Sequence, residues 1–431
     1  MEYYPEGVVV MKFSKIIVIA SVLLVISMLV PSCAPGTKED TATSAPEGTG
    51  DSTPVQPDES PVKLTINGND VSEYRIVYAA SEYASLKSPK RVLRTEYDFY
   101  KLIANDISKR IETLTGFKPE VVSDEEEETD KEIIVGPSTR AESVNNGYDS
   151  MSVYKYLDNV QGSKLVIGAG HVSWDLNGKT VKAYTWSPTF HAFDAVEKYI
   201  RDERAAGKTE VELAADFSLS GKPAVRTVAM IGDSITAGVG SSNAETLAYP
   251  AILQRLLWQD YIIVNLGNSG KTMRDDLGDR YNATAQYRAA LKNAAKFDLV
   301  TIMLGTNDSN RDRNWDTNDD NAYNRSALDL AKAIKDDGKK AAFMIMNCPA
   351  YYGNDEFGSE HVRELQAGLP ALFEKKGYTC AFFDMYTFTD RELTKTMFPD
   401  NLHPNDPGHT LMAEKLATVI PQVFEGNMNP G

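Results

Sequence analysis

The chain has 431 residues, of which 42% are hydrophobic and 25% charged, and its formal net charge is −16. This length allows two or three domains of about 100–200 residues, and the composition excludes a collagen, a wholly disordered chain and a protein with many membrane spans. A chain this acidic repels polyphosphate and shows no basic patch, so we do not expect nucleic acid as a partner.

The amino-terminal segment has the pattern of a signal peptide. Residues Ile16–Val30 are uncharged and apolar and closely follow two lysines. The run is shorter than the ~20 apolar residues that a membrane-spanning helix needs, which favours a cleaved signal over the alternative of a permanent membrane anchor. Residues 1–10 contain two acids and no basic residue, so we expect Met11 to be the initiator.

The apolar run ends in Val-Pro-Ser-Cys, which resembles the cleavage site of a bacterial lipoprotein. The resemblance implies that residues 1–33 form the signal segment and that Cys33 becomes the lipidated first residue of the mature chain. We therefore expect a protein on the outer face of the cytoplasmic membrane, or a secreted one, that meets the membrane only through its lipid. Residues 34–62 are rich in Pro, Thr, Ser, Gly and acids and predict a disordered linker.

Residues 63–220 alternate strand-like and helix-like segments, which predicts an α/β accessory domain. Its acidic run 124–130 is expected to be a solvated loop, not a metal site. Residues Glu132–Arg140 resemble the amino-terminal accessory domain of α-glucuronidase-type glycoside hydrolases. The expected strands lie at 63–66, 74–79, 120–122, 132–136, 152–157 and 164–170, and the expected helices at about 96–115 and 191–207.

Residues 225–427 alternate more regularly, and their strand candidates are short and apolar on both faces, as parallel strands covered on both sides require. The expected strands lie at 226–231, 261–266, 298–304, 341–346 and 380–386, and the expected helices at about 247–258, 284–296, 322–336, 360–376 and 408–424. Five such units predict a flavodoxin-like, doubly wound parallel five-stranded sheet, whose ligands bind beyond the carboxyl ends of the strands.

Cys348 and Cys380 lie at the end of one expected strand and the start of the next. That placement separates them by more than the ~5.5 Å between Cα atoms that a disulfide needs. We expect both to be small apolar residues of the sheet, with a disulfide as the alternative.

Four polar segments fall at one edge of the expected sheet. Three follow strands, at Gly232–Thr236, Asn265–Gly270 and Gly305–Asp308, and the fourth, Asp400–Pro404, precedes the last helix. Each alone is more often a turn or a helix cap, but the four in this order indicate a catalytic site.

Ser234 is the candidate nucleophile, because a serine at a strand-to-helix turn can expose its hydroxyl above the sheet edge. His403 is the candidate base, and Asp400, three residues earlier, can orient its ring. The backbone N–H of Ser234, the backbone N–H of Gly270 and the side-chain amide of Asn307 are the candidate oxyanion donors.

The order Gly-Asp-Ser, Gly, Gly-x-Asn-Asp and Asp-x-x-His-Pro resembles the SGNH (GDSL) hydrolase family over residues 226–425. The resemblance implies the roles just given, with Gly267 as an alternative to Gly270. The family frequently has Asp where this chain has Lys271. Wider stretches, such as GDSITAGVGSS, resemble the sialate O-acetylesterase and carbohydrate acetylesterase branch.

The expected function is removal of acetyl groups from a polysaccharide or oligosaccharide through an acyl-enzyme, with no metal and no cofactor. Trp315, in a polar loop, and Asp233 are candidate substrate-binding residues, although Asp233 fits a helix cap better. One alternative is a lysophospholipase or thioesterase of the same fold. Another is a non-catalytic polysaccharide-binding lipoprotein.

Overall fold

The protein is described by a computed structural model. It describes residues 60–80, 99–146, 155–169, 173–176, 179–182, 186–309, 321–336, 341–351 and 359–430. Met11, Cys33, Trp315 and most of the expected linker lie outside these ranges. Within them, no helix combines the length and apolar character needed to cross a membrane.

Residues 63–221 contain a mixed six-stranded sheet in the order β11-β6-β7-β5-β3-β4 and a three-stranded sheet in the order β10-β1-β2. The first consists of β3 (Arg75–Tyr78), β4 (Val121–Ser123), β5 (Glu132–Val135), β6 (Tyr156–Gln161), β7 (Lys164–Ile167) and β11 (Ser218–Gly221). The second consists of β1 (Lys63–Ile66), β2 (Asn69–Asp70) and β10 (Glu210–Leu213), and β8 (Ser173–Leu176) pairs with β9 (Lys179–Lys182).

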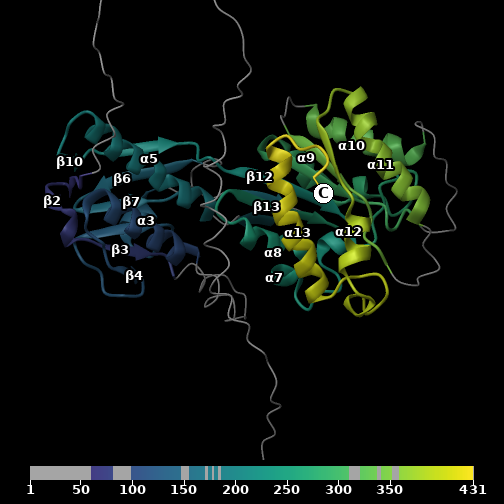
Figure 1. Cartoon of the computed structure of the whole chain (residues 1–431), viewed down its shortest axis with the longest axis horizontal. Helices are drawn as coiled ribbons and strands as arrows, with labels where there is room; N and C mark the ends of the chain where they lie inside the picture. Colours follow the sequence, from purple (N-terminus) through teal and green to yellow (C-terminus); the bar gives the residue numbers. More distant parts are fainter. Residues whose placement is uncertain are drawn as a thin grey trace, which may run out of the picture. The chain divides into compact units, whose positions relative to one another are not determined.

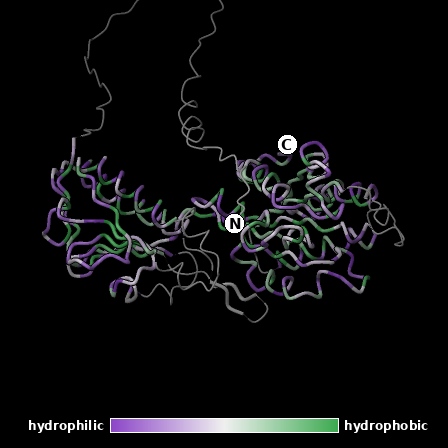
Figure 2. Tube along the Cα trace, turned by 90° about the horizontal axis from the view of Figure 1, so that it is seen from below, coloured by the Kyte–Doolittle hydropathy of each residue, from purple (hydrophilic) through white to green (hydrophobic). Residues whose placement is uncertain are grey.

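Two long helices, α3 (Phe99–Thr115) and α5 (Trp186–Ala205), join both of these sheets in one apolar core. Helix α3 buries residues at helical spacing, among them Ile103, Ile107 and Ile111, as an amphipathic helix on a sheet requires. Figure 2 shows the hydrophobic stretches of this region, in green, inside a more hydrophilic periphery.

The structure corrects several expectations for this region. Strand β6 begins at Tyr156, four residues later than expected, because its register is set by a hairpin to β7 across the turn at Gly162, which has a φ of 61°. Strands β10 and β11 were not expected. The acidic run is mostly exposed, but Asp124 is buried, where its carboxylate accepts hydrogen bonds from the Ala80 and Thr139 backbone N–H groups.

The carboxyl-terminal region is a five-stranded, fully parallel sheet in the order β13-β12-β14-β15-β16. Its strands are β12 (Arg226–Gly232), β13 (Tyr261–Gly267), β14 (Leu299–Met303), β15 (Ala342–Met346) and β16 (Cys380–Phe383). This strand order confirms the predicted flavodoxin-like fold class. The last strand is shorter than expected because Asp384 caps a helix that starts at Met385.

Helices cover both faces of this sheet (Figure 1). One face packs against α9 (Ala285–Asn293), α10 (Ala322–Lys335) and α11 (Ser359–Lys375). The other packs against α8 (Tyr249–Leu256) and α13 (Asp406–Phe424). Three shorter helices are α6 (Ser234–Ala237), α7 (Ala244–Leu247) and α12 (Met385–Glu392). The carboxyl ends of β12, β13 and β14 pair side by side, so the segments that follow them share one edge.

Candidate active site

Ser234 is the first residue of α6, directly beyond the end of β12. The turn is tight: a Cβ added at Gly232 would lie 2.0 Å from the Thr236 hydroxyl oxygen. Asp233 closes the turn by accepting a hydrogen bond from the Ile235 backbone N–H at 3.0 Å. This turn fixes the serine at the carboxyl ends of the parallel strands, with 6% of its surface exposed.

Ser234, His403 and Asp400 form a continuous chain of contacts. The Ser234 hydroxyl oxygen lies 2.9 Å from Nε2 of His403, although 169 residues separate the two in sequence. Nδ1 of the same ring lies 2.6 Å from Oδ2 of Asp400. With its Nδ1 proton directed at the carboxylate, the ring presents a free Nε2 lone pair to the hydroxyl, which is the arrangement that activates a serine nucleophile.

The loop around Asp400 keeps this carboxylate ionised. Burial raises the pKa of Asp400, but hydrogen bonds from the backbone N–H and ring of His403 and from the Leu402 N–H outweigh it and hold the pKa below its ordinary value. An ionised carboxylate on Nδ1 stabilises the imidazolium that forms when the ring takes a proton.

Two of the candidate oxyanion donors follow the strands that pair with β12 on either side. Gly270 lies in the turn after β13 with a φ of 74°, in the left-handed region that favours glycine. Asn307 follows β14, and one N–H of its amide donates to the Lys271 carbonyl at 3.0 Å. The amide has two N–H donors, so the second remains for a substrate oxyanion. Because the contact uses the backbone of Lys271, the departure from the family pattern there leaves it unaffected.

Gly267, the alternative donor, is otherwise engaged. Its backbone N–H donates to the Asn265 side-chain oxygen at 2.9 Å. A Cβ at this position would lie 2.3 Å from the Ala237 nitrogen, so the glycine allows β13 to approach α6 closely. This geometry favours Gly270 as the donor.

We expect Asn307→Ala to lower kcat about 100- to 1,000-fold while KM changes little, because the oxyanion forms only in the transition state. The measurement is steady-state hydrolysis of para-nitrophenyl acetate. Asn307→Asp should be at least as damaging, since it replaces a donor with a negative charge. A variant that raises KM at unchanged kcat would contradict this role.

Asp308, next to this amide, ties two loops together in a way that no sequence motif indicated. Its buried carboxylate accepts hydrogen bonds from the backbone N–H of Met273 at 2.8 Å and of Arg274 at 2.9 Å. The loop after β13, which contains Gly270, is thereby held against the loop after β14. This contact spans 35 residues, so no local sequence pattern predicts it.

Asp233, a candidate substrate contact, lies inside the protein with 1% of its surface exposed. One carboxylate oxygen caps α6, and the other has no hydrogen-bond partner within the described residues. Burial raises the pKa of Asp233 to about 6, although the hydrogen bond from the Ile235 N–H and the nearby His403 act to lower it. A buried cap fits this position better than a surface contact with substrate.

This burial predicts a pH dependence of stability. The ordinary pKa of 3.8 is raised in the folded protein to about 6, so between these pH values the unfolded chain has lost a proton that the folded protein keeps, and unfolding becomes easier as the pH rises. We expect the stability of Asp233→Asn relative to wild type to increase by about 2–3 kcal/mol from pH 4 to pH 7. Chemical denaturation of both proteins at pH 4 and pH 7 measures the free energies of unfolding. A difference between the two proteins that is the same at both pH values would contradict the prediction.

His409 and the two cysteines of this region have structural roles. His409 is buried and neutral: Nδ1 accepts the Tyr249 N–H, Nε2–H donates to the Val239 carbonyl, and burial lowers its pKa. Cys348 and Cys380 are both free and buried, and burial raises the pKa of each thiol to about 12.

Comparison with known proteins identifies the family of the carboxyl-terminal region. Residues 230–411, somewhat less than half of the chain, match the GDSL-like Lipase/Acylhydrolase family. The carboxyl-terminal region is therefore a domain of this family, which confirms the resemblance predicted from the four segments. The match does not include Glu132–Arg140, so the resemblance of the amino-terminal region to an accessory domain stays a prediction.

Particular relatives are esterases. An acetylxylan esterase of Xylanibacter ruminicola is 30% identical over 215 residues, which are 45% of this chain and 42% of that protein. Among solved structures, the carbohydrate acetylesterase Est24 of Sinorhizobium meliloti is 20% identical, with a TM-score of 0.35 over 46% of this chain and 100% of its own. An aryl esterase of M. smegmatis is 18% identical, with a TM-score of 0.36 over 47% of this chain and 99% of its own.

Proposed function

We propose that the carboxyl-terminal domain is a serine esterase that removes acetyl groups from carbohydrate. The observation that carries the proposal is the chain of contacts from Ser234 through His403 to Asp400. The carbohydrate substrate is supported by the relative that is an acetylxylan esterase.

In the proposed reaction, the Ser234 hydroxyl attacks the acetyl carbonyl while Nε2 of His403 takes its proton. Gly270, Asn307 and the Ser234 backbone N–H stabilise the oxyanion. Collapse of this intermediate breaks the bond to the sugar oxygen, which receives the proton from His403, and leaves an acetyl-enzyme. Water then attacks the acetyl-enzyme, again giving its proton to His403, and acetate leaves as Ser234 regains its proton.

The direct test is acetate release from acetylated xylan by the full chain. The proposal predicts that the protein releases acetate from acetylated xylan but none from xylan that has first been deacetylated with alkali. A lysophospholipase or thioesterase would instead show rates that rise with acyl chains longer than about four carbons, and a non-catalytic glycan-binding protein would release no acetate from any ester. Either result would overturn the proposal.

The cellular location is a separate proposal that depends on Cys33. Lipidation at this residue would hold the esterase at the membrane through residues 34–62, the expected flexible linker. We expect Cys33→Ala to move the protein from the membrane fraction to the soluble one, as detected by detergent phase partition. An unchanged distribution would contradict lipidation at this residue.

A further inference from the structure

The loop that follows the nucleophile is fastened to the helix that follows the catalytic histidine. This loop, residues 238–242, begins directly after α6, and α13 begins three residues after His403. The hydrogen bond between Ser234 and His403 is one of several contacts that join these two parts of the chain. The other contacts involve side chains that take no part in the proposed reaction.

Asp406 makes the first of these contacts. It is the first residue of α13, and its carboxylate accepts a hydrogen bond from the Ser242 backbone N–H at 2.7 Å and another from the Ser242 hydroxyl at 2.6 Å. A carboxylate forms stronger hydrogen bonds than a neutral acceptor does. The two bonds together fix the end of the loop against the start of α13.

His409 makes the second contact and is fully buried. Its Nε2–H donates to the Val239 carbonyl at 3.2 Å, while its Nδ1 accepts the Tyr249 N–H at 3.3 Å. The Val239 backbone N–H in turn donates to the Ser234 carbonyl at 2.9 Å. A single residue of the loop therefore connects α13 to the nucleophile.

Between these two contacts, the loop lies directly against the segment that carries the catalytic histidine. Gly240 has a φ of 95°, in the left-handed region that favours glycine. A Cβ added there would lie 2.3 Å from the Pro404 carbonyl oxygen and 2.9 Å from Cβ of His403. Because closely packed groups transmit displacements, a shift of the loop is expected to move His403.

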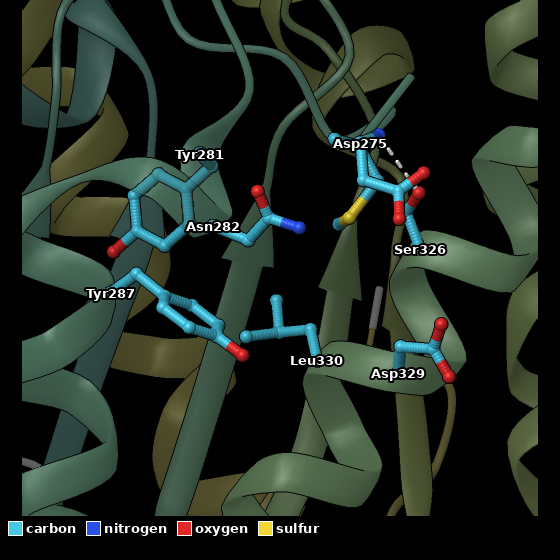
Figure 3. Close-up of a pocket in the computed structure, with 8 residues that line it drawn as sticks. Asp275, Tyr281, Asn282, Tyr287, Ser326, Asp329 and Leu330 are labelled. Atoms are coloured by element: carbon cyan, nitrogen blue, oxygen red, sulfur yellow. Dashed lines mark hydrogen bonds between the residues drawn. The ribbon is translucent and has the colours of Figure 1, made fainter. Parts of the chain in front are cut away.

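The oxyanion loop has separate anchors. In the loop after β13, the Asp275 backbone N–H donates to the Ser326 hydroxyl of α10 at 3.0 Å (Figure 3). The hollow beside this bond has a volume of about 30 Å³, which is room for about one water molecule. The Met273 N–H of the same loop donates to Asp308 at 2.8 Å. Since these bonds involve neither α13 nor residues 238–242, loss of the contacts to α13 should disturb the nucleophile and its base and leave the oxyanion donors in place.

We propose that Asp406 and His409 are positioning residues for the nucleophile and its base. By holding residues 238–242 against α13, they set the distance from the Ser234 hydroxyl to Nε2 of His403. The inference rests on the proposed function, because it concerns the reactivity of the same serine. Proton transfer requires this distance to stay within hydrogen-bond reach, and it is 2.9 Å here. A displacement of about 1 Å can cost about 100-fold in rate, so contacts remote from the substrate can control kcat.

The first test is steady-state hydrolysis of para-nitrophenyl acetate by the full chain. Asp406→Ala should lower kcat about 10-fold or more at unchanged KM, because it removes both bonds to Ser242. Asp406→Asn keeps one acceptor oxygen and should recover part of the loss. Ser241→Ala is the matched control and should change neither constant, since its hydroxyl bonds within the loop.

A role of Asp406 in helix stability alone would give a different result. It would lower the free energy of unfolding, measured by chemical denaturation, and leave kcat of the folded protein unchanged. A folded Asp406→Ala protein with the wild-type kcat would therefore overturn the proposal.

Double variants distinguish positioning from a general loss of structure. The loss caused by Asp406→Ala should disappear in a His403→Ala background, because the contact acts through that ring, and should multiply with the loss caused by Asn307→Ala. A loss that persists without His403, or that vanishes without the Asn307 amide, would overturn the proposal. His409→Leu removes both ring hydrogen bonds and should behave like Asp406→Ala; if it does not fold, the Asp406 variants decide.

Labelling by a fluorophosphonate probe separates this inference from the proposed function. The probe should modify Ser234 of the wild type and react about 10-fold more slowly with Asp406→Ala, in parallel with kcat. Equal labelling rates would overturn the positioning role alone. A wild-type protein that is labelled at Ser234 but releases no acetate from acetylated xylan would overturn the proposed function and leave the positioning role standing.

Discussion

Ser234→Ala is expected to lower acetate release from acetylated xylan by at least about 10,000-fold, because an alanine side chain cannot form the acyl-enzyme. KM should change little, since the hydroxyl acts mainly in the chemical step. Residual activity over the uncatalysed rate would come from the oxyanion donors and substrate positioning.

Ser241→Ala is the matched control for this variant. Ser241 lies in the loop after α6, where its hydroxyl donates to the Gly238 carbonyl. The hydrogen bonds of the His403 ring among the described residues go to Asp400 and Ser234, not to Ser241. It should retain nearly full activity. A Ser234→Ala protein within about 10-fold of wild type, with normal unfolding, would mean that another group is the nucleophile.

His403→Ala should lower kcat by a similar factor, because the serine hydroxyl then has no base 2.9 Å away to take its proton. The double variant Ser234→Ala, His403→Ala should be no slower than either single variant, since the two residues act as one unit. Hydrolysis of para-nitrophenyl acetate by all three variants measures this.

The control is His361→Ala, which removes an exposed histidine on α11. It should leave the rate unchanged. Additive losses in the double variant would contradict a shared mechanism and would indicate that His403 acts on the substrate independently of Ser234.

The fold of the carboxyl-terminal domain could be predicted from the sequence because its local hydrophobic pattern matches the parallel sheet that forms. Four of its five strands are short apolar runs that are largely buried, whereas the edge strand β13 buries only alternate residues. The ends of adjacent parallel strands must meet at one edge. The same reasoning explains why Ser234 and His403 lie close together, since Ser234 lies beyond the end of β12 and His403 precedes a helix of the same domain. The position of a short polar motif directly after a strand therefore predicts that it lies at this edge of the folded sheet.

The amino-terminal region was less predictable for physical reasons. Strand β1 pairs with β10, nearly 150 residues later in the chain, and β6 is placed by a hairpin rather than by its own hydrophobicity. Pairings of this kind depend on partners that a local pattern does not reveal. The hydrogen bonds of Asp308 to the loop after β13 depend on distant partners in the same way. So does the complete burial of Asp233.

The most direct test of the account is to locate the reactive serine in the intact full chain. A fluorophosphonate probe, followed by proteolysis and mass spectrometry, should modify the peptide that contains Ser234, and the modification should disappear in Ser234→Ala and slow strongly in His403→Ala. An unlabelled wild-type protein, or one labelled at another residue, would contradict the central claim that these two side chains form an activated nucleophile.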